Sequence, residues 1–207
     1  LELGFLVTPP LRAAADLMTA SGMEGVQLAA VASATGVTRQ LVYRFFPSRQ
    51  ALVLAVLEDF ADELARRFGH GAAQALPGDG PAVARVFVEA ACDTIEAKGA
   101  GPWELLDATG PDPDVVRAGR ALLDRVIAPW QRRIVDSAGV APGDAAITIR
   151  MIVALGRAVL AQWYGGHLSR AAAVDYTTRG LVAVLAAFTP AAATPAPRKR
   201  LRSDRTR

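Results

Sequence analysis

The fold of this chain is decided by one stretch, Gly36-Val37-Thr38-Arg39-Gln40-Leu41-Val42-Tyr43-Arg44-Phe45-Phe46-Pro47-Ser48-Arg49-Gln50-Ala51-Leu52. Gly36 can adopt the left-handed backbone that ends a helix, and the Thr38 hydroxyl can cap the helix that follows. Pro47 ends that helix, and Ser48 caps a longer one that begins at Arg49. The pattern predicts a tight turn, a short helix over residues 38–46 and the start of another helix.

The short helix is predicted to have two different sides. One side is apolar and the other carries hydrogen-bond donors, namely Arg39, Gln40, Tyr43 and Arg44. A short helix with such donors near its N-terminus, entered by a tight turn from another helix, is what a helix-turn-helix presents to the major groove of DNA. A small helical bundle without this function can also show Gly-Val-Thr before an apolar helix, but that alternative does not explain the four grouped donors. We therefore expect DNA binding.

The same residues resemble the tetracycline-repressor (TetR) family of bacterial transcription regulators. Its N-terminal domain commonly carries Ile-Ala-x-x-Ala-Gly-Val-Ser and, a few residues later, Leu-Tyr-x-x-Phe-x-x-Lys-x-x-Leu. The corresponding segments here are residues 31–38 and 42–52, and the resemblance covers residues 10–52. It implies an all-α regulator with a three-helix head and a larger helical C-terminal domain, about nine helices in all. It also implies a small-molecule site in that domain whose filling releases DNA.

The chain departs from the family pattern at two positions that commonly approach DNA phosphates. Gln27 stands where the family usually has Ser or Thr as a helix cap, and Ala29 stands where a basic residue is common. Arg49 replaces the usual Lys and keeps its charge. Phosphate contacts are therefore expected from Tyr43 and Arg49 more than from the second helix.

The residue types suggest how the DNA would be read. Arg suits guanine edges and Gln suits adenine edges, which fits Arg39 and Gln40 at the helix N-terminus, while Arg44 suits a base or a phosphate. Hydroxyl groups and a cation at a helix N-terminus suit phosphates. The full predicted interface is Gln27, Thr38, Arg39, Gln40, Tyr43, Arg44 and Arg49. Arg12 is a weaker candidate that is equally consistent with a solvated helix face.

Composition limits the class of protein. The chain has 207 residues, of which 52% are hydrophobic and only 6% aromatic. Abundant alanine favours close-packed helices over sheets. The single cysteine, Cys92, excludes an internal disulfide and suits a reducing cytoplasm. No metal-ligand spacing, catalytic triad, phosphate loop or carboxylate pair is present, so we expect no metal, no cofactor and no enzymatic activity.

The net charge of +3 is unevenly distributed. From Arg198 to the end, six basic side chains face one acidic side chain, and the preceding 197 residues sum to −2. The segment 8–52 carries +2, a small charge for DNA binding that a dimer would double. The basic tail is equally consistent with non-specific DNA affinity and with simple solvation.

Apolar periodicity and breaks predict the order of the helices. The segments are 9–21, 27–35, 38–46, 48–68, 81–98, a short helix from Pro102, 112–137 with a kink or split at Pro129, 143–164 and 169–188. We expect three units: a DNA-binding domain over 1–47, a ligand-binding and dimerisation domain over 48–189, and a disordered basic tail over 190–207. A loop is expected over 69–81.

The last two predicted helices are apolar over most of their girth, and such helices need partners on more than one side. A four-helix interface between two copies, through residues 143–188, is the economical solution. The longest apolar stretches, near 151–164 and 181–188, are too short for a membrane span or carry Arg157. We expect a cytoplasmic homodimer without a membrane segment.

Large apolar residues of the C-terminal domain are candidates for an effector pocket: Phe60, Phe87, Trp103, Trp130, Met151 and Trp163. Taken singly, each is better explained as an ordinary core residue, and Trp103, on a short helix between two breaks, is the strongest pocket candidate. The effector would be small and largely apolar. The protein would then be a repressor that binds a palindromic double-stranded operator as a dimer and is released from it when the effector binds. The rival hypothesis is a helical small-molecule-binding protein whose DNA-binding head is vestigial.

Overall fold

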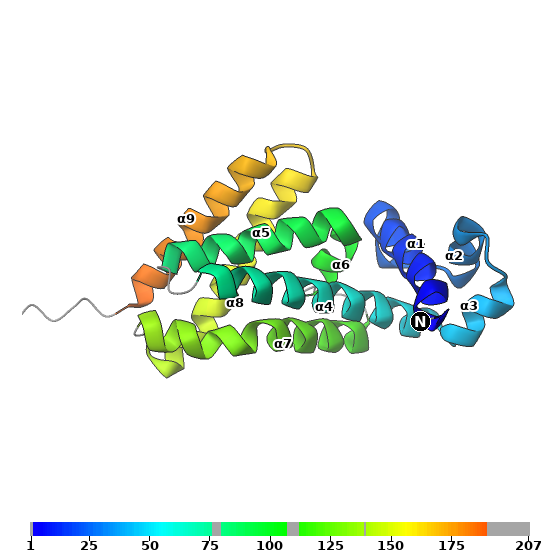
Figure 1. The fold of residues 1–207 in the computed structure, drawn as a ribbon, viewed down its shortest axis with the longest axis horizontal. Helices are drawn as coiled ribbons and strands as arrows, with labels where there is room; N and C mark the ends of the chain where they lie inside the picture. Colours follow the sequence, from blue (N-terminus) through cyan, green and yellow to red (C-terminus); the bar gives the residue numbers. More distant parts are fainter. Residues whose placement is uncertain (1, 76–79, 107–111, 139, 190–207) are drawn as a thin grey trace, which may run out of the picture.

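The computed structural model describes residues 2–75, 80–106, 112–138 and 140–189. Within these ranges, the side chains of residues 2–6, 74, 75, 80, 130, 132–138 and 142 are not described. All regular elements of the described chain are helices, and the described residues contain no strand (Figure 1). The predicted all-α class is therefore confirmed. The predicted tail over 190–207 lies outside the described residues.

The elements of the described chain follow in this order: α1 (Glu2–Gly25), α2 (Leu28–Thr35), α3 (Arg39–Phe45), α4 (Arg49–Ala75), α5 (Gly80–Lys98), α6 (Ala100–Leu105), α7 (Pro113–Ala138), α8 (Pro142–Tyr164) and α9 (Arg170–Phe188). The helices α1, α2 and α3 gather at one end of the molecule, and the C-terminal end of α9 lies at the other (Figure 1).

Helix α1 is longer than the sequence pattern predicts. It begins at Glu2, so Pro9 and Pro10 lie inside it and not in its first turn. A proline inside a helix removes one backbone donor but does not prevent the helix from continuing. The predicted break at Ser21-Gly22 is confirmed, because Gly22 has a φ of 65° and interrupts the helical backbone.

Helix α4 connects the head to the rest of the molecule. Its inward side is completely or almost completely buried from Leu52 to Phe68 and continues to Ala72. The predicted loop over 69–81 was wrong at its start, because α4 runs on to Ala75. A Cβ on Gly71 would lie 2.6 Å from Val86 Cγ1, so α5 packs directly against this glycine. Close packing thus outweighs the low helix propensity of glycine.

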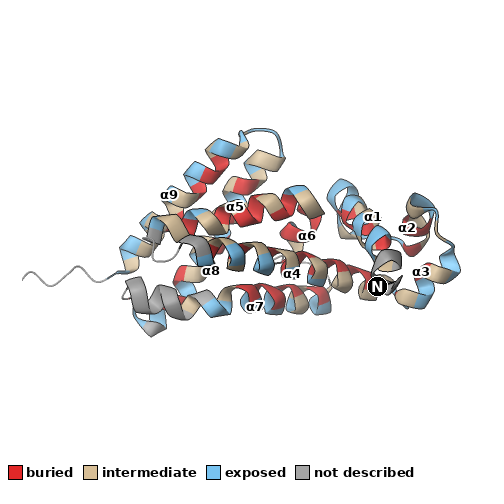
Figure 2. Cartoon of the chain, viewed as in Figure 1, coloured by how far each residue is buried: buried red, intermediate tan, exposed pale blue. Residues whose placement is uncertain are grey.

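The remaining helices cover α4 from several sides. Helix α4 packs on α5 and α7, while the α8–α9 hairpin packs on α5. Buried residues follow the sides of α4, α5 and α7 that face other helices (Figure 2). Pro129 neither ends nor splits α7, which remains one element through Ala138. The loss of one backbone bond at Pro129 is therefore tolerated within a helix of 26 residues.

The head is joined to the larger domain at the corner between α5 and α6. The Gly101 N–H donates a hydrogen bond of 3.0 Å to Thr19 Oγ1 of α1, and Arg12 donates to the Ala97 carbonyl. A Cβ on Gly101 would lie 2.6 Å from the Thr19 backbone nitrogen. The two helices therefore approach through a glycine that no larger residue can replace without movement.

Candidate nucleic-acid interface

The turn between α2 and α3 has the predicted chemistry. Gly36 ends α2 with a φ of 69° and a ψ of 8°, and Thr38 is the N-cap of α3. The Thr38 hydroxyl accepts a hydrogen bond of 3.3 Å from the Leu41 N–H. No atom lies within 4 Å of a Cβ built on Gly36, so glycine is favoured here for its backbone conformation and not for lack of space.

Helix α3 divides into an inward and an outward side as predicted. Val42 and the following Phe46 are buried in the core of the head, at 1% and 5% exposure. The outward side consists of four exposed residues, Arg39, Gln40, Tyr43 and Arg44. Tyr43 is 51% exposed although it is aromatic. A row of donors on one free helix surface is suited to base edges and phosphates.

The beginning of α2 is weakly capped. Gln27 is its N-cap residue, with a φ of −114°, but its side chain makes no capping hydrogen bond. Its amide instead donates to the Glu24 carbonyl at 3.2 Å. The prediction that Gln27 is a poorer cap is confirmed. The side chain is exposed at the start of α2.

Arg49 is positioned differently from the other predicted interface residues. It is half-buried, and its Nη2 donates to the Met23 carbonyl near the end of α1. Its Nε is buried without a partner among the described residues. The side chain therefore ties the beginning of α4 to α1. Sequence reasoning missed this contact because it joins residues that are 26 positions apart, although the family-like spacing placed the cation correctly at the start of α4.

Arg12, the weaker candidate, is engaged within the protein. It forms an ion pair of 3.1 Å with Asp16 and donates to the Ala97 carbonyl. The exposed cations of α3 are therefore Arg39 and Arg44. Ser48 caps α4 as predicted, because its hydroxyl accepts a hydrogen bond of 3.0 Å from the Ala51 N–H.

The residues predicted for the effector pocket do not all meet. Phe87 and Trp103 line a small internal cavity, and Phe60 packs on Trp103 with ring centroids 6.3 Å apart. Trp163 is half-buried, and Met151 is 42% exposed on α8. The side chain of Trp130 lies outside the described residues. Met151 does not line this cavity. An apolar pattern on all sides of a helix does not show which of its residues face inward.

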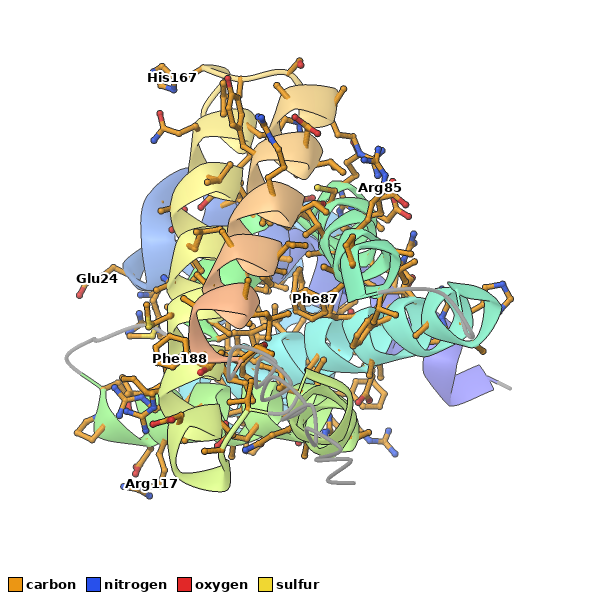
Figure 3. All side chains as sticks on the ribbon, turned by 90° about the vertical axis from the view of Figure 1, so that its left-hand side faces the viewer. Glu24, Arg85, Phe87, Arg117, His167 and Phe188 are labelled. Atoms are coloured by element: carbon orange, nitrogen blue, oxygen red, sulfur yellow. The ribbon has the colours of Figure 1, made fainter. Side chains whose placement is uncertain are left out.

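The cavity lies among residues of α5 to α9, where Phe87 contacts Phe68 of α4 edge-to-face at 4.8 Å. Figure 3 shows Phe87 among the side chains between the α8–α9 hairpin and α4. The space measures about 10 Å³, roughly that of one water molecule. A drug-sized ligand would need these helices to separate.

Four described titratable groups of the larger domain have shifted pKa values, and one of them is Arg66, whose pKa is raised by its hydrogen bond with Glu63. Burial raises the pKa of the Cys92 thiol to about 12. Burial, with the adjacent Glu104, raises the pKa of Tyr164 to about 12, and the Arg66 hydrogen bond lowers that of Glu63 to about 2. In the described parts of the chain, no three His, Cys, Asp or Glu side chains come together as a candidate metal site.

Comparison with protein families matches residues 11–56 to the bacterial regulatory proteins of the tetR family. A TetR-like transcriptional regulator from Rhodococcus sp. RHA1 superposes with a TM-score of 0.68 at 19% identity, over 86% of this chain and 94% of that one. A putative tetR family regulator from Shewanella sp. PV-4 gives 0.68 at 18% identity, over 88% and 97%.

A TetR family transcriptional regulator from Thermus thermophilus gives a TM-score of 0.61 at 20% identity, over 84% of this chain and 97% of that one. Comparison with curated proteins gives no match. The resemblance carried by the sequence motif is confirmed by the family match and by a fold shared along most of the chain. Residues 11–56 thus match the tetR family of bacterial regulatory proteins, and the chain shares the fold of these solved regulators along most of its length.

Proposed function

We propose that this protein is a homodimeric transcriptional repressor that binds a palindromic operator and is released from it by a small ligand. The observation that carries the proposal is the outward side of α3, where four donors stand exposed on a helix capped at Thr38. A helix of this kind, preceded by a tight turn from another helix, enters the major groove in helix-turn-helix proteins.

The proposed contacts follow from chemistry. Arg39 and Gln40, at the first positions of α3, reach base edges, and Arg44 reaches a base or a phosphate. The hydroxyls of Thr38 and Tyr43 hold phosphates and fix the register. Gln27 and Arg49 flank this surface, and Arg49 also holds α4 against α1 through the Met23 carbonyl.

We place the DNA-binding domain at residues 1–47 and the ligand-binding and dimerisation domain at 48–189. The dimer interface is proposed over residues 143–188. On α8, Ile147 and Met151 are 50% and 42% exposed, and Ala154 and Ala158 continue the same exposed stripe. Spacings of four, three and four residues put these side chains on one face of the helix. A second copy would cover this face.

Helix α9 shows the same excess of apolar surface. By length and composition it could cross a membrane, with a mean hydropathy of 1.3, yet only 28% of its most apolar window is buried. The helix packs on α5 and α8 in the fold shared with the solved regulators, which supports a protein partner in place of a lipid one. We accordingly assign the protein to the cytoplasm and no enzymatic activity to it.

Release by a ligand is supported by the path from the cavity to the head. Trp103 lines the cavity on α6, two residues after Gly101. Gly101 donates to Thr19 and touches the α1 backbone. Separation of the helices around Trp103 would move α6 against α1 and change the position of the head. A ligand that favours the separated state would then lower operator affinity.

Selection of bound fragments from a genomic DNA pool at physiological salt tests this function. We expect enrichment of a palindromic motif, with half-sites about one helical turn apart or a multiple of it. The variant Arg39→Ala/Tyr43→Ala should lose specific retention, while its helicity and oligomeric state stay unchanged. Arg85→Ala, an exposed arginine on α5, is the matched control and should bind like the wild type.

Two results would contradict the proposal. Unaltered retention by the Arg39→Ala/Tyr43→Ala variant would show that α3 is not the DNA-reading helix. Absence of any enriched motif from a folded, dimeric protein would favour the rival hypothesis of a ligand-binding protein with a vestigial head.

A further inference from the structure

The connection between α1 and α2 receives little support from its own residues. The last carbonyls of a helix have no partner within it, and the negative end of the helix dipole favours a cation nearby. The last turn of α1 carries no basic residue, and Gly22, with a φ of 65°, sets Met23–Gly25 apart from the rest of the helix. This short turn leads to Gln27, the N-cap of α2, which makes no capping hydrogen bond.

Arg49 supplies the missing cation from the first position of α4. Its Nη2 donates to the Met23 carbonyl, which also accepts a hydrogen bond of 3.2 Å from the Val26 N–H. Its Nε is buried without a hydrogen-bond partner among the described residues. Two of the three guanidinium nitrogens are thus turned towards the protein, and the acceptor is a carbonyl at the end of α1.

The start of α4 is itself fixed to the larger domain. Leu52 and Val53 are buried, at 0% and 1% exposure. The Gln50 amide donates to Asp114 Oδ2 of α7 at 3.3 Å. Neighbouring residues of one turn therefore reach two different parts of the molecule, since Gln50 contacts the larger domain and Arg49 contacts the head.

We propose that Arg49 is a positioning residue for operator recognition and not a phosphate contact. Its bond to the Met23 carbonyl fixes the connection between α1 and α2, and with it the orientation in which α2 and α3 meet DNA. This deepens the proposed function, on which it rests, because a head held in one orientation loses less freedom on binding. The family-like pattern favours the other role, since Arg49 stands where that pattern has Lys, a point charge suited to phosphates.

Three variants separate the two roles. Arg49→Lys keeps the charge, but its ammonium ends one bond short of the Nη2 position and lacks the planar fork of the guanidinium. Arg49→Met removes the charge and keeps an apolar stem. Arg66→Met is the matched control, because Arg66 is an exposed arginine of α4 that pairs with Glu63, and it lies about 25 Å further along the helix.

The first readout is DNA binding as a function of salt concentration, with the duplex selected from the genomic pool and a scrambled duplex of equal length. Both Arg49 variants should bind the selected duplex at least about tenfold more weakly than the wild type, because a hydrogen bond from a charged donor is lost. The slope of log affinity against log salt should stay unchanged, since no phosphate contact is removed. Arg49→Lys should bind the scrambled duplex like the wild type, and Arg66→Met should match the wild type throughout.

The second readout needs no DNA. The carbonyl ¹³C resonance of Met23 should move upfield in both Arg49 variants, because its oxygen loses a hydrogen bond. Hydrogen exchange of the α2 amides should become faster in both variants, while that of the α9 amides stays unchanged. Arg66→Met should leave the resonance and both exchange rates as they are in the wild type.

A phosphate contact predicts a different pattern. Arg49→Lys would then bind the selected duplex like the wild type, and Arg49→Met would lose about one unit of salt slope per head. Either result would overturn the proposal, as would an unmoved Met23 resonance in Arg49→Lys. If the wild type selects no motif, the proposed function fails, while the Met23 resonance and the exchange of α2 still decide whether Arg49 holds the connection. The two failures are therefore distinguishable.

Discussion

Burial of the single residue Cys92 makes the stability of the folded protein depend on pH in the alkaline range. Its side chain is completely buried, and this burial raises the pKa of the thiol from 9.0 to about 12. Between these two pH values the unfolded chain releases a proton that the folded chain keeps. The contribution of Cys92 to stability is therefore fully present below pH 9 and is lost as the pH rises towards 12.

We expect the free energy of unfolding to decrease with increasing pH above 9. The decrease should be less steep in Cys92→Ala, and the two slopes should differ by at most the linkage of about one proton per molecule. Denaturant unfolding at about pH 8, 9, 10 and 11 measures both slopes. Tyr164→Phe is a useful control, because Tyr164 titrates in the same direction from a higher starting value of 10.0. Parallel slopes for wild type and Cys92→Ala would show that the thiol ionises freely in the folded protein.

At the scale of single residues, helix caps and turn conformations were predictable where they depend on residues that are close in sequence. The Thr38 and Ser48 caps and the left-handed Gly36 depend on atoms within a few residues, and all were predicted. Arg49 and Arg12 depend on the Met23 and Ala97 carbonyls, which are distant in sequence. Sequence spacing places a cation at a helix end, but only the packing of that helix decides which acceptor the cation finds.

Elements meet most closely where α6 touches α1. A Cβ on Gly101 would lie 2.6 Å from the Thr19 nitrogen and 2.7 Å from the Met18 carbonyl carbon, and both are backbone atoms that cannot turn aside. Gly101→Ala must therefore push α6 from α1 and weaken the Thr19 hydrogen bond.

We expect Gly101→Ala to destabilise the protein by about 1–3 kcal/mol. Gly156→Ala is the matched control, since its Cβ meets only Thr177 Cγ2 at 3.8 Å, and it should be neutral or slightly stabilising. Denaturant unfolding compares the two. Equal stability of both variants with the wild type would mean that the α1–α6 contact adjusts without cost.

Element boundaries show where sequence patterns are insufficient. Proline and glycine predicted an end to α4 near residue 69 and a start of α1 near residue 9, yet both helices extend further. Intrinsic propensity is worth about 1 kcal/mol for a glycine, and the contact of Gly71 with Val86 offsets it. The sequence also did not show which side of α8 faces inward, because its apolar residues lie on several sides, and Met151 is exposed in the structure.

Among the described residues of the whole molecule, large apolar side chains stay exposed on α8 and α9. Ile147, Met151 and Tyr176 are 50%, 42% and 53% exposed, beside small alanines that permit close approach. The proposed dimer through this face would double the positive charge offered to DNA, which matters because one head carries only Arg39 and Arg44 as exposed cations on α3. Specific operator binding should therefore depend on residues far from the DNA.

We expect Met151→Asp to produce a folded monomer, because a carboxylate at the centre of the proposed interface would be buried without a partner. Operator affinity at physiological salt should fall by at least about tenfold, since each head then binds one half-site alone. Ala65→Asp, an exposed position on α4, adds the same charge elsewhere and should remain dimeric. Sedimentation equilibrium and DNA titration measure both effects. A dimeric Met151→Asp variant with full operator affinity would place the interface on another face, whereas a monomer with full affinity would show that one head is sufficient.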